Sequence, residues 1–322
     1  MFEVAILDDY QEAALQMADW RSLHPQAQIS AVNTHIADLD ALAARLHGCD
    51  AVVAMRERTQ FSAALFARLP NLKLLVTTGM RNAAIDLEAA SKHGVTVCGT
   101  DMLPYPTAEL TWALILAFAR SIAREDRAMR EGKWQTTIGT GLKGKTLGLL
   151  GLGRLGAQVA AIGKAFGMEI IAWSQNLTAE RAAAAGARLV DKEALFAAAD
   201  IVSIHLVLGE RTRALVKADD LARMKPSAFL VNTSRGPIVD ERALITALEG
   251  RRIAGAAIDV FDDEPLPAEH PLRRLPNTVL TPHLGYVTVE NYRLAYGQAV
   301  EAIRAYLAGA PIRVISAPVE TK

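Results

Sequence analysis

Three polar residues of different types each follow a short apolar run in the second half of the chain: Arg235, Glu264 and His283. A guanidinium group holds a carboxylate through two parallel hydrogen bonds, and an imidazole gives or takes a proton near neutral pH. A carboxylate beside an imidazole fixes the orientation of its ring. Because ligands bind at the carboxyl ends of the strands in open α/β sheets, we expect the three side chains to converge there. The set predicts proton transfer to or from a bound carboxylic acid.

A glycine-rich turn precedes these residues in the chain. Gly151-Leu-Gly153-Arg-Leu-Gly156 stands between an apolar run at 146–150 and a helical pattern at 154–166. Gly151 permits a tight turn, Gly153 lets a ligand approach the backbone, and Gly156 allows the helix to pack closely on the strand. The N–H groups at the start of the helix favour an anion. With a strand before it and a helix after it, this pattern predicts a bound dinucleotide pyrophosphate rather than a glycine turn without a ligand.

The residues after the next predicted strand, 168–173, bear on which dinucleotide binds. Sites that prefer NAD usually carry an Asp or Glu there, which binds the ribose 2′-hydroxyl. This chain has Ser174, with Arg181 a short distance further on. Since no carboxylate repels a 2′-phosphate, we expect NADPH to be accepted. The alternative is that NAD binds with Ser174 in place of the acid.

Short apolar runs that alternate with amphipathic stretches must position these groups. Such alternation predicts parallel sheets covered by helices. One series of runs ends near residue 100, and a second begins at 146, after a helical pattern over 107–130. We therefore expect an α/β protein with two Rossmann-like or flavodoxin-like domains and a cleft between them. We also expect helices at 11–20 and 289–309.

The composition disfavours several other classes of protein. The 322 residues include 35 Lys+Arg and 35 Asp+Glu, so the formal net charge is zero. Nucleic acids and anionic membrane surfaces attract basic proteins, so we expect neither as a partner. The two cysteines are too few for a disulfide framework, and no targeting or membrane-spanning pattern is evident. We expect a cytoplasmic protein without a metal site, because no His, Asp or Glu group has ligand spacing.

The motifs together resemble those of the D-isomer-specific 2-hydroxyacid dehydrogenase family, which includes glyoxylate/hydroxypyruvate reductases and D-lactate and D-glycerate dehydrogenases. The similarity covers nearly the whole chain and is strongest from 104 to 290. Besides the glycine turn, the matching segments are Thr107-Ala-Glu-Leu110, Asp200-Ile-Val-Ser-Ile-His205, Met224-Lys-Pro226, Asn232-Thr-Ser-Arg-Gly236, Asp259-Val-Phe261 with Glu264-Pro265, and Thr281-Pro-His283.

This resemblance implies roles for individual residues. Arg235 binds the substrate carboxylate and carbonyl, His283 is the general acid in reduction, and Glu264 hydrogen-bonds His283. The backbone N–H groups of Gly79 and Met80 hold the substrate carboxylate. The implied cofactor contacts come from Gly151, Gly153, Arg154, Leu155, Gly156 and Ser174, and from Thr107, His205, Thr233, Ser234, Asp259 and Gly285, with Asp259 on the nicotinamide carboxamide.

The resemblance also implies an organisation. Residues 1–100 with 290–322 form a substrate domain, residues 101–289 form an NAD(P)-binding domain, and the two close over a small 2-keto acid that becomes a D-hydroxy acid. Homodimers through the cofactor domain are common in the family, and the helix around 107–130 is a candidate contact. Two alternatives stay open: a corepressor-like protein that senses NAD(H) by binding, and a dehydrogenase of a related substrate such as phosphonate or formate. The Arg–Glu–His set favours catalysis over binding alone.

Overall fold

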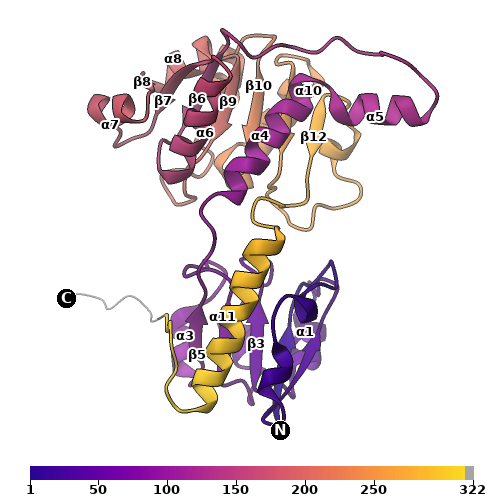
Figure 1. Ribbon diagram of the computed structural model, residues 1–322, viewed down its shortest axis with the longest axis vertical. Coiled ribbons are helices and arrows are strands. Elements are labelled where there is room, and N and C mark those ends of the chain that lie inside the picture. Colours follow the sequence, from indigo (N-terminus) through magenta and orange to yellow (C-terminus); the bar gives the residue numbers. More distant parts are fainter. Residues whose placement is uncertain (316–322) are drawn as a thin grey trace. The chain divides into compact units, whose positions relative to one another are not determined.

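The computed structural model describes residues 1–315 and divides the chain into two compact units. Within the described residues, the first unit contains residues 1–103 and 287–315, and the second contains residues 104–286. Each unit is built around a parallel sheet, as the alternation of apolar runs predicted (Figure 1). Within residues 1–315, no helix has both the length and the apolar character needed to span a bilayer.

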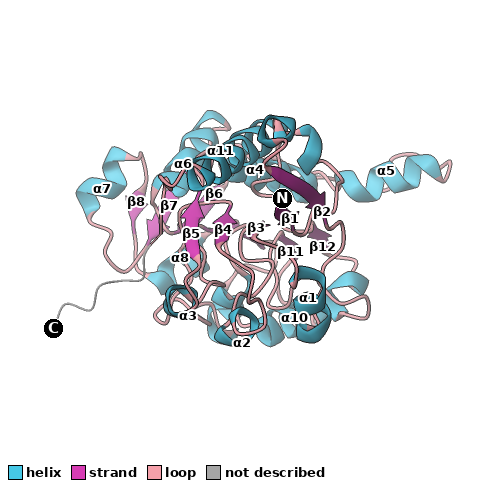
Figure 2. Ribbon diagram, turned by 90° about the horizontal axis from the view of Figure 1, so that it is seen from below, coloured by secondary structure: helices cyan, strands magenta, loops and turns pink. Residues whose placement is uncertain are grey.

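The first unit has a five-stranded sheet in the order β2-β1-β3-β4-β5. Its strands are β1 (Phe2–Ile6), β2 (Ala27–Ala31), β3 (Ala51–Ala54), β4 (Leu74–Thr77) and β5 (Thr96–Gly99), and its helices are α1 (Leu39–Leu46), α2 (Ala63–Phe66), α3 (Leu87–Lys92) and α11 (Val289–Leu307). Helix α11 covers one face of the sheet and α1 to α3 cover the other (Figure 2). Strands β3 and β4 are buried throughout, as parallel strands covered on both faces must be.

The second unit has a seven-stranded sheet in the order β12-β11-β10-β9-β6-β7-β8. Its strands are β6 (Thr146–Leu150), β7 (Glu169–Trp173), β8 (Arg188–Leu189), β9 (Ile201–Ile204), β10 (Phe229–Asn232), β11 (Gly255–Ile258) and β12 (Thr278–Leu280). Its helices are α4 (Pro106–Ala119), α5 (Ile122–Arg130), α6 (Arg154–Ala165), α7 (Ala179–Ala184), α8 (Lys192–Ala198), α9 (Ala218–Arg223) and α10 (Glu241–Glu249). Helices α4 and α6 pack on one face of the sheet, and α8 and α10 pack on the other (Figure 2).

The segment 11–20 does not form the helix that its pattern predicted. It contains two short 3-10 turns, which begin at Ala14 and at Trp20. The carboxylate of Asp9 accepts the N–H groups of Ala13 and Ala14, and the indole of Trp20 donates to the Ala14 carbonyl at 2.8 Å. These bonds join residues four to six positions apart, and the Trp20 indole occupies the Ala14 carbonyl that a helix would use. So short a helix also gains little stability by itself.

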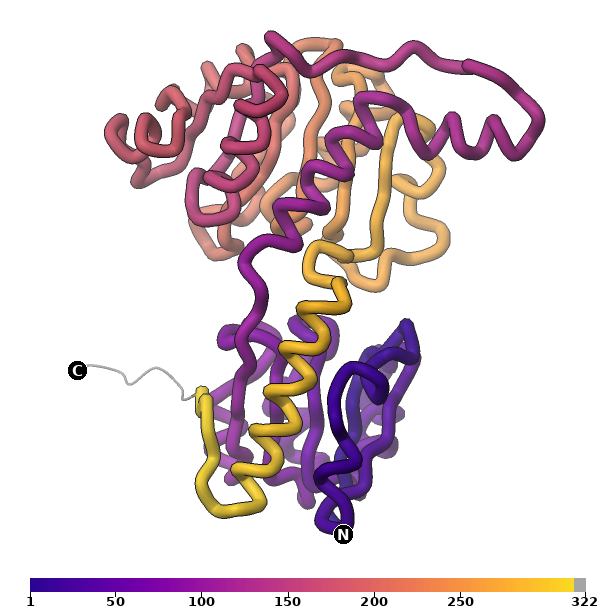
Figure 3. The backbone as a smooth tube through the Cα atoms, viewed as in Figure 1, coloured from indigo at the N-terminus to yellow at the C-terminus, as the bar shows by residue number. Residues whose placement is uncertain are grey.

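The stretch 107–130 is two helices rather than one. Helix α4 ends at Ala119, and Ser121 adopts a left-handed backbone with φ of 52° before α5 begins. The N–H of Thr140 donates to the Ala119 carbonyl at 2.7 Å, so a returning segment satisfies the end of α4. Figure 3 shows residues 120–145 as an arm that leads away from the sheet of their own unit and back to β6. The prediction of a helix at 289–309 is confirmed, because α11 spans Val289–Leu307.

Candidate active site

Three neighbouring parallel strands bring the predicted catalytic residues to one edge of the second sheet. Strand β10 pairs with β11, and β11 pairs with β12, all in parallel. Their carboxyl ends therefore share one edge, and Arg235, Glu264 and His283 lie in the segments that follow them. The turns also pack tightly, because a Cβ on Gly236 would lie 2.1 Å from the carbonyl carbon of Phe261. Only glycine allows the turn after β10 to approach the turn after β11 so closely.

Glu264 and His283 form a hydrogen-bonded pair. The Nδ1 atom of His283 lies 2.6 Å from Oε2 of Glu264, and Oε1 of Glu264 accepts the Phe261 N–H at 2.9 Å. The side chains are 16% and 27% exposed, so the pair is reachable by a ligand and yet partly shielded from water. The ring of Tyr286 packs edge-on against the imidazole, with 5.3 Å between the centroids. The imidazole is thus held on its Nδ1 side, which directs its Nε2 side toward an incoming group.

The turn that carries His283 is shaped by the buried carboxylate of Asp259. His283 has a φ of 53°, an uncommon backbone for a residue other than glycine. Asp259 accepts the Thr281 hydroxyl at 2.6 Å, the Leu284 N–H at 2.7 Å and the Gly285 N–H at 3.0 Å. Burial raises the pKa of the Asp259 carboxyl, while these donors and His283 act in the opposite direction. Asp259 therefore builds the turn, and its contact with a nicotinamide carboxamide stays a prediction.

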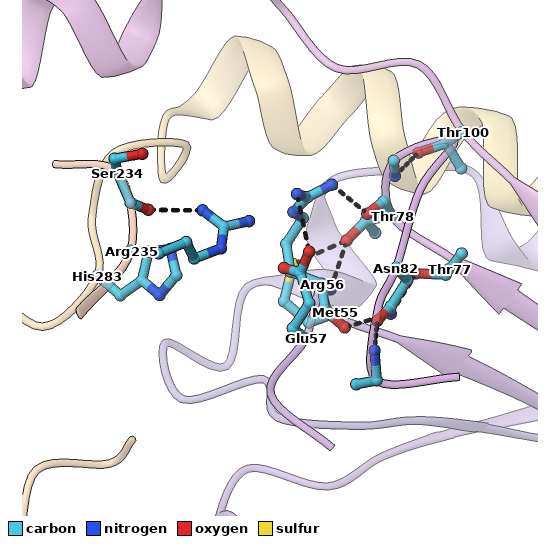
Figure 4. A network of polar contacts seen from close by, with 12 residues as sticks. Met55, Arg56, Glu57, Thr77, Thr78, Asn82, Thr100, Ser234, Arg235 and His283 are labelled. Carbon is cyan, nitrogen blue, oxygen red and sulfur yellow. Dashed lines mark hydrogen bonds and ion pairs between the residues drawn. The ribbon is translucent and has the colours of Figure 1, made fainter. Parts of the chain in front are cut away.

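Arg235 lies in a turn that the side chain of Asn232 organises. Asn232 is buried; its Oδ1 accepts the Ser234 N–H and its Nδ2 donates to the Arg235 carbonyl, both at 3.0 Å. The Nη1 group of Arg235 donates to the Ser234 carbonyl at 2.7 Å (Figure 4). This bond orients one edge of the guanidinium group.

The glycine turn has the geometry that its spacing predicted. Gly151 has a φ of 100°, and a Cβ there would lie 2.4 Å from the His205 carbonyl oxygen. A Cβ on Gly156 would lie 2.2 Å from the Gly151 carbonyl oxygen, whereas one on Gly153 would meet no atom within 4 Å. Gly153 is also the N-cap of α6, without a side-chain cap. The open space and the uncapped N–H groups of Arg154 and Leu155 suit a dinucleotide pyrophosphate.

The remaining predicted cofactor residues surround this turn or join neighbouring segments. Burial lowers the pKa of His205 to about 4, so its ring is neutral at physiological pH, and its Nε2 lies 2.9 Å from the Ser203 hydroxyl. Ser174 follows β7 directly, and Nη1 of Arg181 donates to the Asn176 carbonyl at 3.4 Å. A guanidinium group therefore lies against the turn where the ribose of a dinucleotide is expected.

Hydroxyl groups connect α4 to the site. The Thr107 hydroxyl donates to the Gly285 carbonyl at 2.9 Å, and the Thr111 and Thr233 hydroxyls lie 2.8 Å apart. The Ser234 hydroxyl forms a short hydrogen bond with the Leu206 carbonyl. These contacts fix the loops after β9, β10 and β12, and the direct cofactor contacts of Thr107, Thr233, Ser234 and Gly285 stay predictions.

The loop expected to hold the substrate carboxylate lies in the first unit, after β4. Gly79 has a φ of 99°, and Met80 has an exposed side chain. The expectation for Gly79 changes, because its N–H donates to the Thr100 hydroxyl at 3.0 Å and is not available to a ligand. Within residues 1–315, the Met80 N–H has no acceptor. Of the two expected donors, Met80 is therefore the one that can bind a carboxylate.

Sequence reasoning missed the residues that hold these loops in place. Asn232 and Thr281 shape the turns of the second unit, and Thr100 and Arg56 hold the loop of the first (Figure 4). A signal existed for Arg56, because a charged residue comes two positions after the wholly buried strand β3. No local pattern marks Thr100 or Thr281, since their partners are distant in sequence. Asn232 bonds to Ser234 and Arg235 within one of the matching segments. The residues described here contain no group of three or more His, Cys, Asp or Glu side chains that could hold a metal ion.

Comparisons with known proteins agree with this geometry. Residues 112–285 match the model of the D-isomer specific 2-hydroxyacid dehydrogenase NAD binding domain. A glyoxylate reductase from Aeropyrum pernix is 42% identical over 255 residues, which are 76% of each chain. A D-3-phosphoglycerate dehydrogenase from Synechocystis is 39% identical over 267 residues. The match covers 82% of this chain and only 48% of that longer protein. A solved structure, a putative D-3-phosphoglycerate dehydrogenase from Ralstonia solanacearum, superposes with a TM-score of 0.93, 38% identity and full coverage of both chains.

The chain belongs to the D-isomer specific 2-hydroxyacid dehydrogenase family. It is an oxidoreductase with the two parallel α/β sheets of that family and with a match to its NAD binding domain.

Proposed function

We propose that this dehydrogenase reduces a small 2-keto acid, of the size of glyoxylate or hydroxypyruvate, to the D-2-hydroxy acid with NAD(P)H. The observation that carries the proposal is the hydrogen bond between Glu264 and His283 at the edge of a sheet that also bears the glycine turn. The glyoxylate reductases among the relatives support the substrate class, at 42% identity for those of Aeropyrum pernix and Thermococcus litoralis.

The chemistry assigned to His283 follows from its partner. Nδ1 carries a proton toward Glu264 in this arrangement, so Nε2 is left for the oxygen of the substrate. His283 donates a proton to the carbonyl oxygen in reduction and takes it back in oxidation. Glu264 keeps the ring in place and balances the charge of the imidazolium ion. When bound, the dinucleotide supplies or accepts the hydride at the substrate carbon.

Arg235 and Met80 bind the carboxylate of the substrate in this proposal. The fork of N–H groups on Arg235 fixes the plane of a carboxylate, and therefore the face of the adjoining carbonyl that is presented. The Met80 N–H adds a neutral donor. Gly79 serves by its positive φ, which turns the backbone so that the next N–H is exposed.

A substrate panel tests the proposal. The full-length protein is mixed with NADH or NADPH, and the loss of nicotinamide absorbance is followed with glyoxylate, hydroxypyruvate, pyruvate and bulkier keto acids. We expect the highest kcat/KM for glyoxylate and hydroxypyruvate. Wherever the product is chiral, we expect the D-enantiomer. Binding of the dinucleotide without turnover of any keto acid would instead favour a sensing role.

We propose that NADPH is accepted and is preferred over NADH. Ser174 places no negative charge after β7, and Arg181 folds back over the same turn. A guanidinium group there stabilises a 2′-phosphate. The test is the ratio of kcat/KM for NADPH and NADH in the wild type and in Arg181→Ala. A strong NADH preference in the wild type rejects the proposal.

We further propose a cytoplasmic homodimer that forms through the arm at 120–145. Ile122, Met129, Trp134 and Ile138 are exposed on this arm, and Ile138 is fully exposed. Helix α5 carries both acidic and basic side chains, which allows two copies to pair by symmetry. Cys49 and Cys98 are both free and buried, as suits a reducing compartment. Light scattering on the wild type and on a Trp134→Ser/Ile138→Ser variant tests the assembly, and an equal mass for both rejects the arm as the interface.

A further inference from the structure

The imidazole of His283 needs more than one contact to keep a single orientation. The torsion that turns a histidine ring about its bond to Cβ has broad minima, and this torsion decides where the Nε2 atom points. The hydrogen bond from Nδ1 to Glu264, at 2.6 Å, fixes one corner of the ring. Glu264 is itself held, because it accepts the Phe261 N–H at 2.9 Å. A bond at one corner still allows the plane of the ring to tilt, so a second contact is required to fix that plane.

The ring of Tyr286 supplies such a contact. It lies at 74° to the imidazole of His283, with 5.3 Å between the ring centroids. This is the edge-to-face arrangement that aromatic pairs prefer. Tyr286 is only 8% exposed, so protein atoms enclose its ring on most sides. A tilt of the imidazole would therefore disrupt the contact between the two rings.

The backbone directly before Tyr286 is fixed on both sides of Gly285. The Gly285 N–H donates to Asp259 at 3.0 Å, and the Gly285 carbonyl accepts the Thr107 hydroxyl at 2.9 Å. A Cβ on Gly285 would lie 3.2 Å from Oγ1 of Thr107 and 3.3 Å from Oδ2 of Asp259, so this glycine packs closely between the two side chains. Since Asp259 also shapes the turn of His283, one well-held segment carries both rings.

We propose that Tyr286 is a positioning residue for proton transfer, and that its ring keeps the imidazole of His283 in the orientation in which Nε2 meets the substrate oxygen. This inference rests on the proposed function, in which His283 is the general acid. Proton transfer needs the donor within hydrogen-bond reach of its acceptor, and a small displacement of a reacting group lowers the rate. Tyr286 acts through His283 and not on the substrate, and the part that acts is the ring rather than the hydroxyl.

Three substitutions at one position test this role. Tyr286→Leu and Tyr286→Met remove the ring and keep an apolar side chain, whereas Tyr286→Phe keeps the ring. Loss of the ring should lower kcat about fivefold, which corresponds to about 1 kcal/mol, the usual strength of one aromatic pair. The KM of the keto acid should stay unchanged, because the contact orients a group that acts in the transition state. Tyr286→Phe should keep the kcat of the wild type.

Phe166→Leu is the matched control. Phe166 stacks on Trp112 with 5.0 Å between the ring centroids, so this variant also removes one ring from an aromatic pair of the second unit. Phe166 ends helix α6, whose other end begins at the glycine turn, and therefore lies away from the edge that carries His283. This variant should keep both kcat and KM.

The mobility of the His283 ring in the ligand-free protein separates this role from the proposed function. The full-length protein is labelled with ¹³C at histidine Cε1, and the His283→Gln spectrum identifies the His283 signal among those of the seven histidines. Relaxation of this signal should report a rigid ring in the wild type, Tyr286→Phe and Phe166→Leu. It should report a mobile ring in Tyr286→Leu and Tyr286→Met, and thermal unfolding shows that each variant compared is folded.

The combined outcomes decide between the two proposals. A mobile imidazole in the variants without the ring, together with no reduction of any keto acid by the wild type, rejects the reductase proposal and leaves the role of Tyr286 standing. A variant without the ring that keeps the wild-type kcat overturns the role of Tyr286, and so does one that loses activity while its imidazole stays rigid. Tyr286→Phe with the lowered kcat of Tyr286→Leu overturns it as well, because the hydroxyl would then be the part that acts.

Discussion

The two units place polar groups at the carboxyl edges of their parallel sheets, but they fix these groups in different ways. In the second unit, buried Asp259 and Asn232 accept backbone N–H groups and so shape the turns that carry His283 and Arg235. In the first unit, a charged side chain does this work, because Arg56 spans the loops after β3 and β4. The seven-stranded sheet thus presents the hydrogen-bonded pair of His283 and Glu264, and the five-stranded sheet presents a charged frame around a backbone N–H group.

The difference suggests a division of labour. Groups that take part in chemistry need one fixed geometry, and bonds from buried carboxylate and amide groups to the backbone provide it. In the first unit, the half-buried ion pair of Arg56 and Glu57 lies beside the loop after β4. Changes in the second unit should therefore alter kcat or KM for every substrate. Changes in the first unit should act first on the stability of its loops.

The largest expected effect is that of His283→Ala. Loss of the general acid should lower kcat by about 10³-fold, within the usual range for proton transfer by a positioned side chain. Binding of the dinucleotide, followed by nicotinamide fluorescence, should survive because the glycine turn is untouched. A kcat near that of the wild type would show that His283 is not the general acid. The proposed difference between the two units would then be wrong.

Arg235→Ala should act mainly on substrate binding. Removal of the bidentate partner of the carboxylate should raise KM for the keto acid by about 100-fold. Steady-state kinetics for at least two keto acids measure this effect, which should be equal for both. Arg188→Ala makes the same change of charge at an exposed position on β8 and should leave KM unchanged.

Gly79→Ala tests how firmly Arg56 is held against the loop after β4 in the first unit. Alanine is strained at a φ of 99°, and its Cβ would collide with Arg56, so the free energy of unfolding should fall by about 2 kcal/mol. Gly48→Ala is the matched control, because a Cβ there meets no atom within 4 Å. Denaturant unfolding of both variants gives the difference. Equal free energies of unfolding for the two variants would mean that the Arg56 side chain moves away from the new Cβ at little cost. Arg56 would then not hold the loop in a fixed position.

The smallest expected effect is a pH dependence of stability that comes from His205. Its folded pKa of about 4 lies below the unfolded value of 6.5, so the unfolded state binds more protons between these values. This contribution is complete above pH about 6.5 and is lost as the pH falls toward 4, by at most about 2 kcal/mol between pH 7 and 5. His205→Gln should unfold with less pH dependence than the wild type, and the exposed His47→Gln should not differ from it. Parallel curves for all three proteins would refute the account.

The sequence predicted the second unit more fully than the first. A strand at 146–150 and a helix at 154–166 were predicted, and the structure has Thr146–Leu150 and Arg154–Ala165. The glycine spacing also predicted the tight turn at Gly151, where φ is 100°, and the close packing at Gly156. Such motifs are local, since a tight turn and a helix start need particular residues at fixed offsets.

What could not be predicted depends on individual side-chain hydrogen bonds, some of them between distant segments. The bond from Gly79 to Thr100 links two loops that follow neighbouring strands, and it reverses the role expected of the Gly79 N–H. The helix expected at 11–20 failed because Asp9 and Trp20 capture its backbone groups, which a periodic pattern does not reveal. Hydrophobic periodicity reports burial along one segment and does not report such hydrogen bonds.

The first unit is assembled from both ends of the chain, and this affects the order in which the protein can be completed during synthesis. Helix α11 packs on β4, and residues near Val314 bridge to Cys98 on β5. The continuous second unit can fold as soon as it leaves the ribosome, because domains fold as units during translation. The five-stranded sheet must wait for helix α11, which is translated after the second unit, before its second face is covered. A chain that stops before residue 289 would therefore leave that face without its cover.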